Sequence, residues 1–119
     1  MKASQALGAF AALSQETRLG IVRLLVREGP NGLSAGAIAD AAKVSPSNIS
    51  FHLKELEHAG LIEARREARS IIYSASYDGL RDLIGFLMKD CCAGRPEICA
   101  PVLAEPCCSP LKARKRAHA

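Results

Sequence analysis

The feature that most constrains this chain is the stretch from Ser45 to Gly60, SPSNISFHLKELEHAG, which has the pattern of a complete helix with both of its ends. Ser45 suits the N-cap, and Pro46 suits the first helical position, where no N–H group is needed. Gly60 suits the left-handed residue just past the C-terminal end. The apolar residues of this helix share one stripe, the predicted buried side: Ile49, Leu53 and Leu56.

The opposite side of this helix carries hydrogen-bonding groups, one cation and one aromatic ring. Such a set suits base edges, phosphate oxygens and the methyl group of thymine. We therefore predict a DNA recognition helix. Its predicted DNA-binding residues are Ser47, Asn48, Ser50, Phe51, His52 and Lys54. Within this set His52 lies beside the buried stripe, which favours a role in orienting the helix.

Three helices are expected before the recognition helix. Residues 3–13 have the spacing of a short amphipathic helix, and Ser14 is the predicted cap of a second helix. Ser34 is the predicted start of a third, SAGAIADAA. Only Lys43 and Val44 separate this third helix from the recognition helix, so the two are predicted to form a helix-turn-helix.

Beyond Gly60 the apolar period changes from 3.6 residues to two, which predicts strands over 61–66 and 70–75 joined as a hairpin, or wing. Cations near its tip are predicted to contact phosphates or the minor groove: Arg65, Arg66 and Arg69. Tyr77 begins a last helix whose apolar stripe is too broad for a small domain to cover. We assign this stripe, with the first helix, to a homodimer interface. The predicted fold of residues 1–90 is mainly α with a small β-hairpin, a dimeric winged helix-turn-helix domain for DNA binding and dimerisation.

Positive charge is concentrated at the end of the chain. The net charge is +4, and four residues after Glu105 supply all of it: Lys112, Arg114, Lys115 and Arg116. Residues 1–105 therefore balance at zero, so DNA affinity of the folded part must come from local placement of Lys and Arg. No apolar run approaches the roughly 20 residues of a membrane span. We expect no membrane partner and a cytoplasmic location, in which cysteines stay reduced.

Residues 91–119 differ in composition from the rest. Prolines recur every few residues, and neither helical nor strand periodicity survives. We predict an irregular segment with a basic tail. All five cysteines of the chain lie in it: Cys91, Cys92, Cys99, Cys107 and Cys108.

Two runs, LSQETRLGIVRLLVREG and LSAGAIADAAKVSPSNISFHLKELEHAGLIEARREARSIIYS, resemble the ArsR/SmtB family of metal- and metalloid-responsive repressors. The likeness covers about residues 7–90. It rests on the serine-rich recognition helix leading into HLKELEHAGL and on the basic wing with its tyrosine. The resemblance implies a homodimer that binds a palindromic operator in double-stranded DNA and releases it when an inducer binds.

The sequence departs from two common inducer sites of this family. The helix SAGAIADAA lacks the cysteine pair of the best-known arsenite sensors, and the last helix has Asp78 and Asp82 but no histidine of the zinc type. The spacing CCAGRPEIC resembles family variants whose arsenite site lies just after the last helix. The resemblance therefore implies that As(III), or Sb(III), binds the metal-site residues Cys91, Cys92 and Cys99, with Cys107 and Cys108 as possible additions.

The chemistry of the thiolates agrees with this implication. Soft thiolates select soft acceptors, and trivalent arsenic takes three sulfurs, whereas structural zinc wants four ligands in spaced pairs. Two alternatives stay open: a zinc or cadmium site that recruits Cys107 or Cys108, and redox sensing by disulfide formation. A third is an enzyme resembling Cys-dependent arsenate reductases, because CSPLKAR has the required Cys-to-Arg spacing, but its loop lacks glycine. We predict an arsenite-responsive repressor with no catalytic residues and no organic cofactor.

Overall fold

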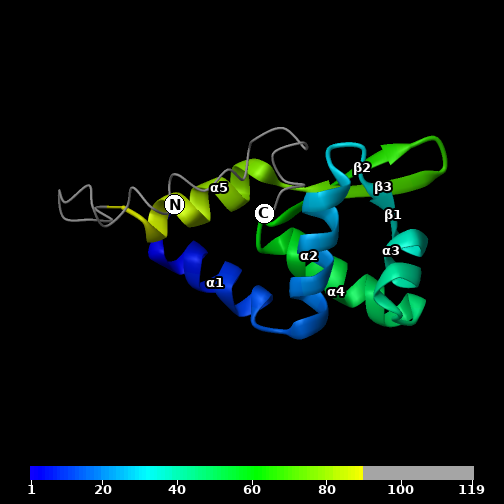
Figure 1. Ribbon diagram of the computed structural model, residues 1–119, viewed down its shortest axis with the longest axis horizontal. Helices are drawn as coiled ribbons and strands as arrows, with labels where there is room; N and C mark the ends of the chain where they lie inside the picture. The colour runs from blue at the N-terminus through cyan, green and yellow to red at the C-terminus, as the bar shows by residue number, and fades with distance from the viewer. Residues whose placement is uncertain (90–119) are drawn as a thin grey trace, which may run out of the picture. The chain divides into compact units, whose positions relative to one another are not determined.

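Five helices and three strands make up residues 1–89, the part of the chain that this computed structural model describes (Figure 1). In chain order they are α1 (Ala3–Leu13), α2 (Glu16–Glu28), β1 (Leu33–Ser34), α3 (Ala35–Ala42), α4 (Pro46–His58), β2 (Ile62–Glu67), β3 (Ser70–Ala75) and α5 (Tyr77–Leu87). The order is that of a winged helix-turn-helix, so the predicted fold class is confirmed.

The recognition helix α4 begins and ends as its sequence predicts. The Ser45 hydroxyl accepts a hydrogen bond from the Asn48 backbone N–H at 3.3 Å, and Pro46 occupies the first turn. Gly60 follows the helix with φ +80°, a conformation that favours glycine. The apolar stripe is at most 1% exposed, which confirms its predicted burial: Ile49, Leu53 and Leu56.

The start of α2 differs from the prediction, in which Ser14 caps this helix. The N-cap is Gln15, whose side-chain oxygen accepts a hydrogen bond from the Arg18 backbone N–H at 2.9 Å. Ser14 instead closes α1, where its hydroxyl donates to the Ala11 carbonyl at 2.8 Å. The end of α1 and the start of α2 share one short polar segment. Ser14 satisfies the end of α1, so the next residue, Gln15, caps α2.

The sheet has three antiparallel strands in the order β1-β3-β2, one strand more than the predicted hairpin. Strands β2 and β3 pair from Ile62 with Ala75 to Glu67 with Ser70, which confirms the wing. The additional strand β1 pairs Leu33 with Tyr73. Just before it, Gly32 has φ +73°, and an added β-carbon would collide with the β3 backbone. This glycine lets β1 approach the sheet.

The core lies where the helix-turn-helix packs on α2 and on the base of the sheet. Its largest fully buried side chains are Ile21, Leu25, Ile38, Ile49, Leu53, Leu56 and Leu61. The fully buried residues of α1 are the alanines Ala6, Ala9 and Ala12, and Leu13 at its end is half-buried against the core; α5 contributes Leu83. Two larger apolar side chains of α1 are exposed, Leu7 at 68% and Phe10 at 39%.

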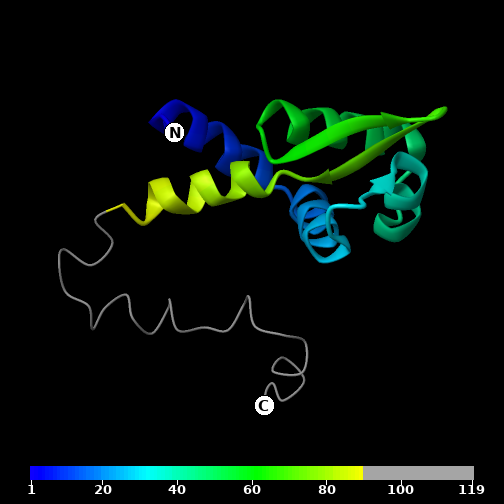
Figure 2. The same ribbon diagram turned by 90° about the horizontal axis from the view of Figure 1, so that it is seen from above.

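Residues 1–86 form one compact unit. Within it, α1 and α5 lie at the end opposite the tip of the β2–β3 hairpin (Figure 2). At the start of α5, the Ser76 backbone N–H donates to the Leu61 carbonyl at 2.9 Å, which ties α5 to the end of the recognition helix. In the described part of the chain, no helix has the length and apolar character needed to cross a membrane.

Candidate nucleic-acid interface

The outward side of α4 is a continuous exposed surface on a helix whose other side is buried. Phe51 is 58% exposed, a high value for an aromatic ring. The Ser50 hydroxyl donates to the Pro46 carbonyl at 3.2 Å and keeps its lone pairs available. The side chains on this surface, which we call the recognition surface, are Ser47, Asn48, Ser50, Phe51 and Lys54. Four of the five can exchange hydrogen bonds with base edges or phosphate oxygens.

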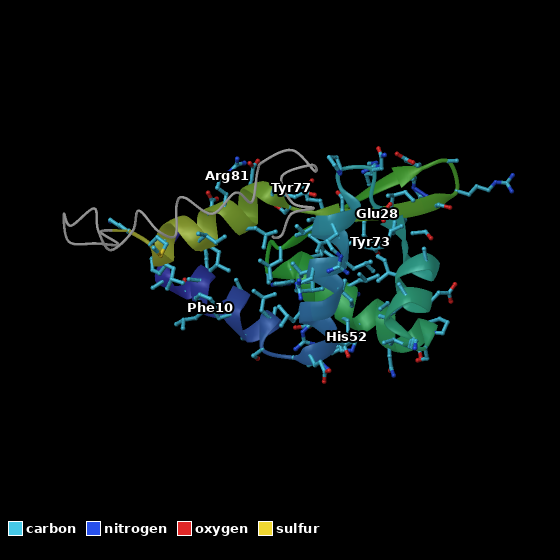
Figure 3. The ribbon with its side chains drawn as sticks, in the orientation of Figure 1. Phe10, Glu28, His52, Tyr73, Tyr77 and Arg81 are labelled. Carbon is cyan, nitrogen blue, oxygen red and sulfur yellow. The ribbon has the colours of Figure 1, made fainter. Side chains whose placement is uncertain are left out.

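His52 is half-buried and is held from inside the chain. Its Nδ1 lies 3.2 Å from Nη1 of Arg18, which sits in the first turn of α2. His52 is labelled in Figure 3. A guanidinium group has no acceptor, so this hydrogen bond requires His52 Nδ1 to be the acceptor. This contact fits the expected role of His52 in orienting α4, while direct contact with DNA stays a prediction.

The three wing arginines differ in their surroundings. The guanidinium of Arg65 forms an ion pair with Glu67 at 2.7 Å and donates to the carbonyls of Pro30 at 3.1 Å and Asn31 at 2.7 Å. It therefore fastens the wing to the loop before β1, a role that the sequence analysis missed. Arg66 and Arg69 are exposed, and within residues 1–89 neither makes a side-chain hydrogen bond or ion pair. These two guanidinium groups are free to meet phosphates.

Tyr73 lies in the central strand of the wing, paired with Leu33 on one side and Ala64 on the other. Burial raises the pKa of its hydroxyl above 10.0, and the carboxylate of Glu57 on α4 raises it further. The phenol is therefore neutral at physiological pH. Tyr73 thus adds an uncharged polar group, rather than a negative charge, to the centre of the sheet.

The described part of the chain, residues 1–89, contains no cluster of potential metal ligands. Within residues 1–89, no three His, Cys, Asp or Glu side chains come together as potential metal ligands. In α5, Asp78 pairs with Arg81 one turn later. The predicted inducer ligands, Cys91, Cys92, Cys99, Cys107 and Cys108, lie outside the described residues.

Comparison with known proteins finds relatives that match most of this chain. A helix-turn-helix domain family matches residues 13–65. Nodulation protein NolR of Rhizobium meliloti is 35% identical over 69% of this chain. The match spans 65% of the length of NolR, slightly less than two thirds. The transcriptional regulator YgaV of Escherichia coli strain K12 is 33% identical over 76% of this chain and 89% of its own length. An ArsR-like transcriptional regulator from Rhodococcus sp. RHA1 has a similar structure, with a TM-score of 0.67 and 31% identity over 86% of this chain and 94% of the other.

The helix-turn-helix and its wing define the fold, and these relatives make the chain a winged helix-turn-helix transcriptional regulator. The relatives are regulators and not enzymes, which supports the predicted absence of catalysis. Within this class, the chain belongs to the ArsR family.

Proposed function

We propose that this regulator is a repressor that binds operator DNA as a homodimer and releases it when trivalent arsenic or antimony binds its C-terminal cysteines. The observation that carries the DNA-binding part is the recognition surface of α4, exposed beside a wing whose Arg66 and Arg69 make no side-chain hydrogen bond within residues 1–89. In this proposal Ser47, Asn48, Ser50 and Phe51 read bases in the major groove. Phosphate oxygens are bound by Lys54, Arg66 and Arg69.

Dimerisation is proposed from apolar side chains that the chain itself leaves uncovered. Leu7 and Ile84 are 68% and 61% exposed, and Phe10 and Phe86 are 39% and 37% exposed. A related winged helix-turn-helix domain from Mycobacterium bovis, 29% identical with a TM-score of 0.60, is described as homodimeric. A twofold dimer would place two recognition helices in successive major grooves, about 34 Å apart, and would match a palindromic operator.

The inducer is proposed from the cysteine chemistry and from one further relative. Three thiolates on one short segment, Cys91, Cys92 and Cys99, suit a trivalent arsenic centre. A structure of a possible transcriptional regulator for arsenical resistance is 29% identical, with a TM-score of 0.56. Differential affinity of the inducer for the DNA-free dimer would weaken operator binding about 5- to 150-fold.

A second candidate inducer is a thiophilic divalent ion such as cadmium or zinc. A homologue of the cadmium resistance regulator CadC from Staphylococcus aureus is 31% identical over 63% of this chain. Such an ion wants four ligands, so Cys107 or Cys108 would join the three thiolates.

Fluorescence anisotropy of the reduced protein on a duplex that it selects from a random-sequence pool tests the proposal. Near-stoichiometric arsenite should release the duplex, and the substitutions Cys91→Ser, Cys92→Ser and Cys99→Ser should each abolish release. Cys108→Ser is the matched control and should leave arsenite release intact. Release by cadmium or zinc alone, lost in Cys107→Ser or Cys108→Ser, would replace arsenite by the second candidate.

The direction of regulation needs its own measurement, because one relative, HlyU of Vibrio cholerae, is a transcriptional activator and is 32% identical. A reporter gene placed behind the selected duplex should be silenced by the protein and restored by arsenite. Reporter expression that rises when the protein is supplied without arsenite would contradict repression while leaving DNA binding in place.

A further inference from the structure

A single guanidinium group joins three helices on the inner side of the recognition helix. Nε of Arg18, in α2, donates to the Ala12 carbonyl at 2.8 Å, and Nη1 donates to Nδ1 of His52 at 3.2 Å. Ala12 is in the last turn of α1, where backbone carbonyls have no partner within the helix. Arg18 thus satisfies the end of α1 and holds α4 with the same side chain.

His52 also contacts the recognition surface, through the neighbouring residue Phe51. The rings of His52 and Phe51 meet edge to face, with centroids 5.8 Å apart and an interplanar angle of 62°. Phe51 is an exposed member of the recognition surface, whereas His52 and Arg18 are half-buried. A rotation of the imidazole would therefore move the surface against which the Phe51 ring rests.

We propose that Arg18 is a positioning residue for DNA recognition, which acts through His52 and does not itself touch DNA. The apolar stripe of α4 already fixes the helix in the core. The contribution of the bond between Arg18 and His52 is to set the rotation of α4 relative to α1 and the position of the Phe51 ring. The inference rests on the proposed binding of DNA by the recognition surface.

A matched pair of substitutions at His52 separates positioning from folding. In His52→Asn the side-chain oxygen takes the place of Nδ1 as acceptor. In His52→Leu the side chain has nearly the shape of asparagine but no acceptor. On the duplex selected by the wild-type protein, the Asn variant should bind within about twofold of wild type, and the Leu variant about tenfold more weakly. Leucine is the better helix former, so an effect of helix propensity alone predicts the opposite order.

The Arg18→Gln substitution tests whether the effect passes through His52. Because the two side chains would act as one unit, the double variant Arg18→Gln/His52→Leu should bind no more weakly than Arg18→Gln alone. Long-range ¹H–¹⁵N spectra of the imidazole, assigned by comparison with His52→Asn, should show the proton on Nε2. Independent, multiplying losses in the double variant, or a proton on Nδ1, would overturn the inference.

The outcomes distinguish this inference from the proposed function. A wild-type protein that selects no duplex would overturn DNA binding and the inference together. Selection of a duplex that the Asn and Leu variants bind equally well would overturn the inference alone.

Discussion

Gly79 is the residue at which the start of α5 comes closest to the end of the recognition helix. A β-carbon at this position would collide with the carbonyl oxygen of Gly60 and lie 3.0 Å from the hydroxyl oxygen of Ser76. Alanine normally stabilises a helix relative to glycine, but here the backbone leaves no space for its methyl group. The absence of a side chain at Gly79 therefore permits the packing of α5 on the turn after α4.

The Gly79→Ala substitution should lower the free energy of unfolding by about 1–3 kcal/mol, because one of two backbone segments must shift. Gly20→Ala, in α2, is the matched control, since an added β-carbon there meets nothing within 4 Å. That control should raise stability by about 0.5–1 kcal/mol. Urea unfolding of the two variants beside wild type gives both values, and changes of the same sign would contradict the packing argument.

Residue roles were predictable where their partners are close in sequence. Ser45 and Gly60 follow from helix-capping rules, because each acts on backbone within a few residues of itself. Arg65 and Arg18 were not assigned their contacts, because their partners Asn31 and His52 are 34 residues away. A long cation can reach many carbonyls, and only the folded chain selects which one lies within range.

Among the elements, the wing likewise has one part that local sequence predicts and one part that it does not. The β2–β3 hairpin was predictable from its alternating pattern and its basic turn. The third strand β1 was not, because Leu33–Ser34 is too short to show any period. The side chain of Arg65 fastens the hairpin to the loop before this strand. The wing is thus held along one side by Arg65 and carries the exposed cations Arg66 and Arg69 near its tip.

This difference predicts unequal effects of two wing substitutions on DNA binding. Arg69→Ala should reduce the slope of log affinity against log salt by about 1, because one phosphate contact is lost. Arg65→Ala should change the slope less and lower the thermal midpoint more, since its guanidinium is bonded within the chain. Anisotropy titrations at several salt concentrations and thermal unfolding separate the two effects, and equal slopes for both variants would place Arg65 among the phosphate ligands.

At the scale of the whole molecule, apolar surface is left over after the core is complete. The sequence predicted a broad stripe on the last helix, and Leu83 is the member of that stripe that becomes buried. Ile84 stays 61% exposed. Periodicity identifies an apolar face but does not say whether the chain or a second copy covers it. The proposed homodimer assigns this remaining surface to a partner protomer.

Ile84→Glu should weaken the homodimer more than tenfold, because a charge would be desolvated in the proposed interface. Leu19→Glu is the matched control, since Leu19 is, like Ile84, an exposed branched aliphatic residue, 45% exposed, but lies on α2. Sedimentation equilibrium should show monomers for the first variant under conditions in which wild type and the control are dimers. Dimers of unchanged affinity in Ile84→Glu would remove α5 from the interface.

The residues of α4 fall into two sets, one buried in the core and one exposed. Ile49, Leu53 and Leu56 serve the core, whereas the recognition surface makes few contacts with the chain that carries it. Under the proposed mode of DNA binding, substitutions on that surface would change which DNA is bound at little cost in stability. After a gene duplication, two copies of such a regulator could diverge toward separate operators while keeping one scaffold, so this fold is well suited to evolve new regulatory circuits.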